Sequence, residues 1–302
     1  MNIINLENIS KTFGSHLAVN NLTLSVPKGS IYGFIGPNGS GKTTTIRMIM
    51  NILYPDNGKV RIFGKEQTGS RLDQVGYLPE ERGLYKKMKV KKLIQFYGEL
   101  KNVANPGKVA VDWLEKFDLS PWANKKVEAL SKGMSQKVQF IITVINKPSV
   151  VILDEPFSGL DPINADIIKE EILKLQDEGS TIIFSTHDMA VAEMMCDYIF
   201  MIHKGEKVLD GTLQSIQDQF SKDTIKVQLN GGKHILNDIP NIDKINDFGQ
   251  VQEIRMFPDS DPQEILSAII SKTKVTKFEI TSPSLNDIFI RIARPEKNEN
   301  NE

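Results

Sequence analysis

The sequence predicts an α/β protein built around a parallel sheet, followed by a small second unit of α+β type. A glycine-rich segment, Gly36 to Thr44, lies between the apolar run Ile31 to Ile35 and a helix-like segment, the arrangement of a phosphate-binding loop. Apolar runs alternate with helical patterns as far as Gly211, which is typical of a parallel sheet covered by helices. Beyond Gly211, short alternating strands and amphipathic helices begin again, so a second core is expected there.

The segment Gly36 to Thr44 fits the pattern G-x-x-x-x-G-K-[ST] at every fixed position. Its glycines permit backbone conformations that other residues avoid, so successive N–H groups can point at a phosphate chain. Lys42 supplies a positive charge for the β- and γ-phosphates, and the Thr43 hydroxyl can bind Mg²⁺. The alternative is a glycine-rich turn before a helix, but the strand–loop–helix context favours nucleotide binding. The predicted phosphate-binding residues are Gly36, Pro37, Asn38, Gly39, Ser40, Gly41, Lys42, Thr43 and Thr44.

The residues before this loop are expected to form a small antiparallel sheet. Strand-like runs extend from Asn2 to Val26, and a further strand is expected at Lys59 to Phe63. Phe13 lies in a predicted turn between the first two runs, where its ring could lie against a nucleotide base. Taken alone, Phe13 fits packing in a core or a turn better than base stacking.

A helical insertion is predicted to interrupt the α/β core. Helical spacing appears at Val90 to Leu100, Lys108 to Phe117 and Ser135 to Ile145. Buried strands are then expected at Ser149 to Leu153 and Thr181 to Ser185, because both are short continuous apolar runs. The remaining elements expected before Gly211 are helices at Ile163 to Gln176 and Asp188 to Cys196, and strands at Tyr198 to Ile202 and Lys207 to Leu209.

The second unit reads as a small α+β sandwich with its own core. Its sequence shows neither metal-ligand spacing nor a catalytic cluster. Residues 295 to 302 are polar and lack apolar anchors, which predicts a disordered tail. The expected elements are strands at Thr224 to Leu229, Gln252 to Met256 and Lys277 to Thr281, and helices at Pro262 to Ser271 and Ser284 to Ala293.

Two adjacent carboxylates, Asp154 and Glu155, follow the predicted buried strand Ser149 to Leu153. Ligands of parallel α/β sheets gather at this end of the strands. Asp154 can hold Mg²⁺ directly or through water, and Glu155 can act as a base on a water that faces the γ-phosphate. The alternative is that the two carboxylates form a solvated acidic turn. The phosphate loop upstream favours the functional interpretation over this one. His187 follows the next buried strand and is expected beside the pair, although a structural histidine is equally compatible with the sequence.

Composition narrows the class of protein. The 302 residues are 40% hydrophobic and 25% charged, with a formal net charge of −1, so nothing in the charge favours nucleic-acid binding. Cys196 is the only cysteine and the N-terminus lacks the pattern of a signal peptide, so a cytoplasmic location is expected. The apolar runs are shorter than the ~20 residues that span a bilayer, so work at a membrane would require another chain.

Several motifs together resemble those of ATP-binding cassette (ABC) ATPases in order and spacing. They are Phe13, GPNGSGKTT, LSKGMSQ at residues 130 to 136, VVILDEP at 150 to 156, SGLDP at 158 to 162 and STHD at 185 to 188. The resemblance implies an ABC cassette of the P-loop NTPase class over residues 1 to 211, with an antiparallel β subdomain and a helical subdomain over about 84 to 146. The small α+β domain would then cover residues 212 to 294.

The resemblance also implies roles for single residues, with ATP and Mg²⁺ as the cofactors. Phe13 would stack on adenine, residues 36 to 44 would hold the phosphates, and Asp154 would help to bind Mg²⁺. Glu155 would be the base, and His187 would contact the γ-phosphate and keep the water in line. Ser131 and Gly133 would contact ATP held by an opposite protomer, so that two cassettes close face to face.

Two positions depart from the family pattern. The usual LSGGQ signature reads LSKGM here, with Lys132 and Met134 in place of a glycine and the glutamine. Glu80 stands where the family commonly has a glutamine that senses Mg²⁺ and the membrane partner. A carboxylate could still bind the metal or a water, but it adds negative charge beside Asp154 and Glu155.

The leading hypothesis is the ATPase subunit of a membrane exporter, held on the inner face of the cell membrane by a separate transmembrane permease. The stretches GYLPEERGLY, LSKGM and PSLNDIF resemble bacterial exporter ATPases of the sodium-efflux and drug- or peptide-resistance type. The first alternative is a soluble ABC ATPase that acts on ribosomes or DNA. It is disfavoured by the single cassette and by the absence of a long heptad insert or a basic patch. A structural nucleotide-binding module is a third possibility, which Glu155 and His187 weaken. The sequence names neither the substrate nor the composition of the dimer.

Overall fold

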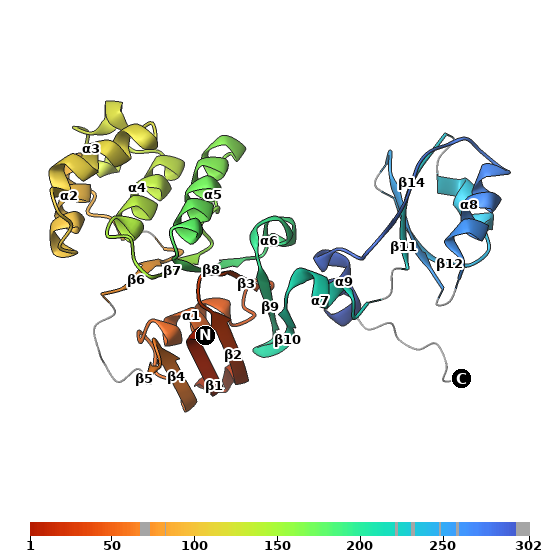
Figure 1. The fold of residues 1–302 in the computed structure, drawn as a ribbon, viewed down its shortest axis with the longest axis horizontal. Helices are drawn as coiled ribbons and strands as arrows, with labels where there is room; N and C mark the ends of the chain where they lie inside the picture. The colour runs from red at the N-terminus through yellow and green to blue at the C-terminus, as the bar shows by residue number, and fades with distance from the viewer. Residues whose placement is uncertain are drawn as a thin grey trace. The chain divides into compact units, whose positions relative to one another are not determined.

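In the computed structural model the chain divides into two units, Met1–Thr212 and Leu213–Glu302, which are described one at a time (Figure 1). The structure describes residues 1–66, 73–81, 83–220, 223–230, 233–247, 249–257 and 260–293. The predicted disordered tail, residues 295 to 302, lies outside these ranges. The boundary expected after residue 211 falls one residue before this division.

The first unit contains an antiparallel sheet with the strand order β2-β1-β4-β5. Its strands are β1 (Asn2–Phe13), β2 (His16–Pro27), β4 (Asn57–Ile62) and β5 (Lys65–Glu66). Alternate residues such as Ile4, Leu6, Leu22 and Leu24 are buried, which is the pattern of a sheet with one covered face. The hairpin between β1 and β2 places Phe13 opposite His16 at its turn.

A second sheet has the order β10-β9-β3-β8-β7-β6 and provides the edge on which the site is built. Strands β6, β7, β8, β3 and β9 run parallel, and β10 pairs with β9 antiparallel. The carboxyl ends of the parallel strands therefore meet at the same edge. The bounds are β3 (Ile31–Ile35), β6 (Val75–Leu78), β7 (Val150–Asp154), β8 (Thr181–Thr186), β9 (Tyr198–His203) and β10 (Glu206–Gly211).

Strand β7 shows why this sheet reads as continuous apolar runs. Val151 and Leu153 face one hydrophobic core, and Val150 and Ile152 face another. Both faces of the strand are thus covered, and each fully buried aliphatic side chain contributes about 1.5–3 kcal/mol. Helices α2 to α5 stand on one side of the strands, and α1 with the antiparallel sheet stands on the other (Figure 1).

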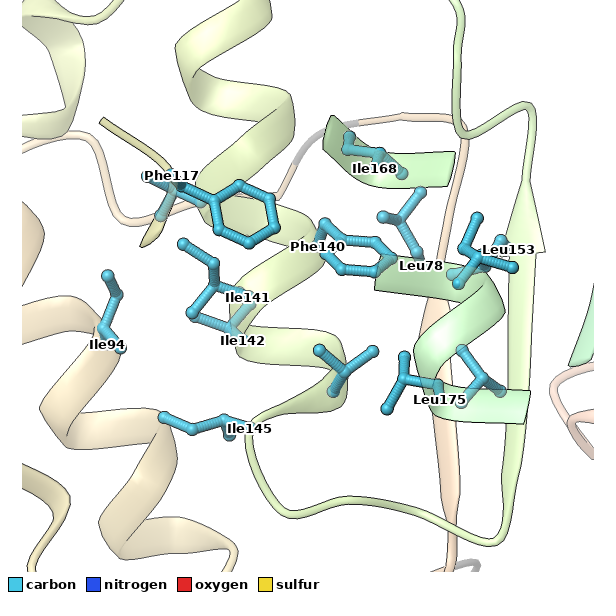
Figure 2. Close-up of a cluster of buried hydrophobic side chains, with 14 of the residues drawn as sticks. Leu78, Ile94, Phe117, Phe140, Ile141, Ile142, Ile145, Leu153, Ile168 and Leu175 are labelled. Carbon is cyan, nitrogen blue, oxygen red and sulfur yellow. The ribbon is translucent and has the colours of Figure 1, made fainter. Parts of the chain in front are cut away.

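The helices of the first unit are α1 (Lys42–Ile49), α2 (Val90–Leu100), α3 (Pro106–Lys116), α4 (Lys132–Val144), α5 (Pro162–Asp177) and α6 (Met189–Met195), with short 3-10 turns at Ser120–Trp122 and Val127–Ala129. Phe117 and Phe140 pack with their ring centroids 5.9 Å apart, near Ile168 of α5 and Leu153 of β7 (Figure 2). The helical insertion therefore shares one core with the central sheet.

The second unit is an antiparallel sheet of order β12-β13-β11-β14 with helix α8 packed on its apolar face. Ile265 and Ile269 of α8 meet Ile225, Val227 and Ile254 of the strands. The bounds are α7 (Leu213–Gln217), β11 (Thr224–Leu229), β12 (Ile242–Asp247), β13 (Gln252–Met256), α8 (Pro262–Ile270), β14 (Val275–Thr281) and α9 (Leu285–Ala293), with a 3-10 turn at Lys233–Asp238. Within the described ranges, no helix has the length and apolar character needed to cross a membrane.

Candidate nucleotide site

The predicted phosphate loop connects β3 to α1, as the sequence pattern indicates. Gly41 caps α1 with a φ of 113°, a conformation in which glycine meets no Cβ clash. Gly36 is required for a different reason, since a Cβ there would lie 2.2 Å from the carbonyl oxygen of Ile202 in β9. The loop is thus pressed against the neighbouring strand, with the N-terminus of α1 directed at the space that it encloses.

Lys42 is held inside this loop. Its side chain is only 6% exposed, and its Nζ donates to the carbonyl oxygens of Gly36 at 2.7 Å and Pro37 at 3.2 Å. The Oε1 atom of Glu155 lies 4.0 Å from the same ammonium. Burial lowers the pKa of Lys42, and the nearby carboxylates, Glu155 first, oppose that shift. The carboxylates thus offset part of the effect of burial on the Lys42 ammonium.

Asp154 ends β7 and is 1% exposed. Ser185 is its partner in the parallel register with β8, and the Ser185 hydroxyl donates to Asp154 Oδ1 at 2.5 Å. The second oxygen, Oδ2, is buried and has no hydrogen-bond partner among the described residues. A buried carboxylate oxygen without a hydrogen-bond partner costs free energy of folding. A further ligand that bound to Oδ2 would remove this cost.

Glu155 is turned out of the strand. Its φ of 50° is left-handed, which ends the β7 ladder, and its N–H donates to the Ser185 hydroxyl at 3.0 Å. The Nδ1 atom of His187 lies 3.0 and 3.1 Å from the two Glu155 carboxylate oxygens. The Glu155 side chain is 11% exposed, whereas His187 is 60% exposed. The imidazole thus fixes the orientation of a mostly buried carboxylate from the solvent side.

Ser185 is a site residue for which sequence reasoning proposed no role. One hydroxyl holds both members of the acidic pair, as donor to Asp154 and acceptor from the Glu155 N–H. The signal that could have revealed it is register. Ser185 is the last residue of the second predicted run and Asp154 directly follows the first, and the parallel pairing of β7 with β8 places the two side by side.

The phosphate loop, Glu80 and Glu155 border one open cleft of about 460 Å³. Phe13 lines it and is 47% exposed, so its ring is a wall of the cleft and not part of the core. Glu80 also lines it. Gly36, Pro37 and Ser40 shape the loop without lining the cleft. The lining residues are Phe13, His16, Ala18, Asn38, Gly39, Gly41, Lys42, Thr43, Thr44, Glu80 and Glu155.

Ser131 and Gly133 are not brought to this cleft. Ser131 is the N-cap of α4, and its Oγ accepts from the N–H of Met134 at 3.2 Å. The helix therefore starts at Lys132, earlier than the Ser135 or Gln136 expected from sequence. The candidate metal residues are Thr43 and Glu80, which line the cleft, and Asp154, which is buried at the end of β7 and is not among the lining residues. Across the described ranges, no cluster of His, Cys, Asp and Glu forms a metal site by itself.

Comparison with known proteins gives two family matches. Residues 19–158 match the family described as ABC transporter, and residues 211–293 match the C-terminal domain of the ATP-binding protein DrrA1-3-like family.

Whole-chain relatives and a solved structure agree with these matches. The chain is 38% identical to YhaQ, an uncharacterized ABC transporter ATP-binding protein of Bacillus subtilis, over 95% of this chain and 97% of YhaQ. It is 29% identical to the Nod factor export ATP-binding protein I of Burkholderia lata, over 96% of each chain. Among solved structures, an ATP-binding subunit of an ABC transporter shares 28% identity with a TM-score of 0.68, covering 72% of this chain and 93% of that one. The chain therefore belongs to the family of ABC transporter ATP-binding proteins and is an ATPase of that family.

Proposed function

We propose that the chain hydrolyses Mg²⁺-bound ATP in the described cleft and that this drives export through a separate membrane subunit. The observation that carries the proposal is the placement of Lys42 and Glu155 at one cleft, with Nζ and Oε1 4.0 Å apart. A cation for the phosphates and a carboxylate base for water are thus within reach of the same substrate group.

The binding roles follow from the walls of the cleft. The backbone N–H groups of residues 36 to 44 and the Lys42 ammonium would hold the phosphates, while the exposed ring of Phe13 would stack on adenine. Thr43, Asp154 and Glu80 would hold Mg²⁺. Hydroxyl and carboxylate oxygens suit this ion, and the partnerless Oδ2 of Asp154 fits such a role. Mg²⁺ would supply positive charge that offsets the phosphates.

Glu155 would take the proton from the attacking water. Its carboxylate is oriented by His187 Nδ1 at 3.0 and 3.1 Å, and its backbone is held by Ser185. His187 is exposed enough to reach a phosphate on the solvent side, which supports its proposed contact with the γ-phosphate. Lys42 would stabilise the negative charge that develops on the phosphoryl oxygens.

A second cassette would complete each site. Ser131 and Gly133 do not line the cleft of their own chain, but they lie at the start of α4, where a helix N-terminus favours an anion. In the proposed assembly they contact ATP bound to the opposite cassette, and hydrolysis lets the two cassettes part. Identical or different cassettes could form this pair.

Export is proposed as the direction of transport. The similarity to a Nod factor export ATP-binding protein extends over 96% of the chain, and the match to the DrrA1-3-like C-terminal domain covers residues 211–293. Sodium ions, drugs and peptides are the proposed cargo classes. The substrate pathway would be lined by the permease, and the cassette would sit peripherally on the inner face of the cell membrane.

The substitution Glu155→Gln tests the hydrolytic mechanism. The amide keeps the size of the side chain but cannot accept a proton, so ATP binding should persist while turnover falls by about 10²-fold or more. ATP binding and phosphate release would be measured on the purified variant, and its assembly state by light scattering with and without ATP. An ATP-stabilised dimer is expected, and retained turnover would exclude Glu155 as the base.

Recovery from membranes tests the transporter role. The chain, purified with its natural partners, should bring with it a polytopic membrane protein. Recovery with ribosomes or DNA instead would favour the alternative of a nucleic-acid-associated ABC ATPase.

A further inference from the structure

The aromatic wall of the nucleotide cleft is in contact with a positively charged side chain. The Lys11 ammonium lies 5.8 Å from the centroid of the Phe13 ring, a separation at which a cation is attracted to an aromatic face. Phe13 is among the residues that line the cleft, whereas Lys11 is not. The half-exposed ring therefore borders the cleft with a part that the ammonium leaves open.

Asp56 fixes the position of that ammonium. Its Oδ1 atom accepts from Lys11 Nζ at 2.7 Å, and its Oδ2 atom accepts from the N–H of Thr12 at 2.7 Å. The Lys11 side chain is only 17% exposed, so this long side chain does not move freely in solvent. One carboxylate thus binds both residues that directly precede Phe13, one through its side chain and the other through its backbone.

The backbone around Asp56 is itself fixed against β1. The N–H of Asp56 donates to the carbonyl oxygen of Ser10 at 2.8 Å, and Ser10 is the last residue of β1 that pairs with β4. A Cβ built on Gly58 would lie 2.4 Å from two carbonyl oxygens of β1, so the two strands approach closely here. Beyond Ser10, where the pairing with β4 ends, the Asp56 side chain accepts the N–H of Thr12 in place of a strand carbonyl.

We propose that Asp56 and Lys11 are positioning residues for recognition of the nucleotide base. The Asp56 carboxylate fixes the Lys11 ammonium, and the ammonium fixes the orientation of the Phe13 ring on which the base stacks. An aromatic ring that is already held loses less side-chain entropy when a ligand binds, which strengthens binding. The inference rests on the base-stacking role that the proposed function gives to Phe13.

The test compares Mg-ADP with Mg-pyrophosphate as ligands in isothermal titration calorimetry. Both carry two linked phosphates, but only ADP has a base. Asp56→Ala and Lys11→Met should each raise the Kd of ADP about threefold, the effect expected of an exposed cation–π contact, and leave the Kd of pyrophosphate unchanged. Phe13→Ala should raise the Kd of ADP about tenfold, the effect expected of a lost stacking partner, and likewise leave that of pyrophosphate unchanged.

Three further variants separate this role from a general disturbance of the sheet. Lys11→Arg keeps the cation and should keep the wild-type Kd of ADP. Glu66→Ala is the matched control, because it removes an exposed carboxylate of the same sheet that pairs with Lys59 at 3.1 Å and does not line the cleft. It should leave both Kd values unchanged. In the Phe13→Ala background, Asp56→Ala should have no further effect on ADP, because the ring to be positioned is absent.

The contrary outcomes are distinct. An unchanged Kd of ADP in Asp56→Ala and Lys11→Met would overturn the inference. So would an equal rise in the Kd of pyrophosphate, which would indicate a general disturbance of the site or a phosphate contact by Lys11. A threefold effect of Asp56→Ala that persisted without the Phe13 ring would overturn it as well.

The Phe13→Ala variant separates the inference from the proposed function. If Phe13→Ala left the Kd of ADP unchanged, the base-stacking role in the proposed function would fail, and the inference would fail with it. A loss of ADP affinity in Phe13→Ala without any effect of Asp56→Ala or Lys11→Met would overturn the present inference alone.

Discussion

Removing the Ser185 hydroxyl should damage both the fold and the site, because that one group joins the ends of β7 and β8. Ser185→Ala takes the donor from Asp154 Oδ1, a bond of 2.5 Å to a carboxylate that is 1% exposed. It also leaves the N–H of Glu155 without its acceptor at 3.0 Å. A hydrogen bond to a charged group contributes about 1.5–3 kcal/mol, and a buried unsatisfied donor costs about 1–3 kcal/mol. We expect a total loss of about 3 kcal/mol of unfolding free energy.

Ser180→Ala is the matched control. Ser180 immediately precedes the same strand, is 7% exposed, and donates only to the neutral carbonyl of Pro148 at 2.8 Å. Its loss should cost about 1 kcal/mol. Both tryptophans of the chain, Trp113 and Trp122, belong to the first unit, so tryptophan fluorescence in a guanidinium titration reports the unfolding of that unit. Equal losses for the two variants would refute the bridging role, and so would full ATPase activity in Ser185→Ala.

Two further predictions concern stability. Burial lowers the pKa of Lys101 from 10.5 to about 8, so between these values the unfolded chain binds more protons than the native one and the unfolding free energy rises with pH. From pH 7 to 9 this rise should be about 1.4 kcal/mol, and Lys101→Met should remove it; parallel pH curves for variant and wild type would contradict the shift. In the phosphate loop, Gly36→Ala forces a Cβ to within 2.2 Å of the Ile202 oxygen, whereas a Cβ on Gly39, at a φ of 77°, meets nothing within 4 Å. Nucleotide-free denaturation should therefore show a loss of about 3 kcal/mol or more for Gly36→Ala and about 1 kcal/mol for Gly39→Ala, and similar losses would argue against the close approach to β9.

Elements with strong periodicity could be read from the sequence. Helix α2 has the predicted bounds Val90–Leu100, and β7 lies within one residue of the predicted run. Helix α4 was predicted to start too late because Gly133 in the first turn lowers the helical signal, while the Ser131 cap stabilises the turn. Strand β12 (Ile242–Asp247) was missed, because its half-exposed residues and its Asp, Lys and Asn side chains give little strand signal.

The candidate site was predictable where it depends on local sequence. The phosphate loop and the pair Asp154–Glu155 are contiguous, so their chemistry is visible in a few residues. The bond between Ser185 and Asp154 joins positions 31 residues apart and depends on which strands are neighbours. Likewise, only the folded chain brings together Lys11 and Asp56, which are 45 residues apart. The contacts proposed for Ser131 and Gly133 are made with a second cassette, so the structure of one chain does not contain them.

The left-handed backbone conformation of Glu155 is unfavourable for stability, whereas its carboxylate is the proposed base in hydrolysis. A residue with a side chain loses about 1–2 kcal/mol in this conformation relative to glycine, so the φ of 50° is a place where glycine would suit the backbone better. The role proposed for Glu155 as the base for the attacking water is a reason to keep a carboxylate at a position where the backbone favours glycine. Replacing Glu155 by glycine should therefore relieve the backbone while removing the proposed base, so that a gain in stability would accompany a loss of turnover.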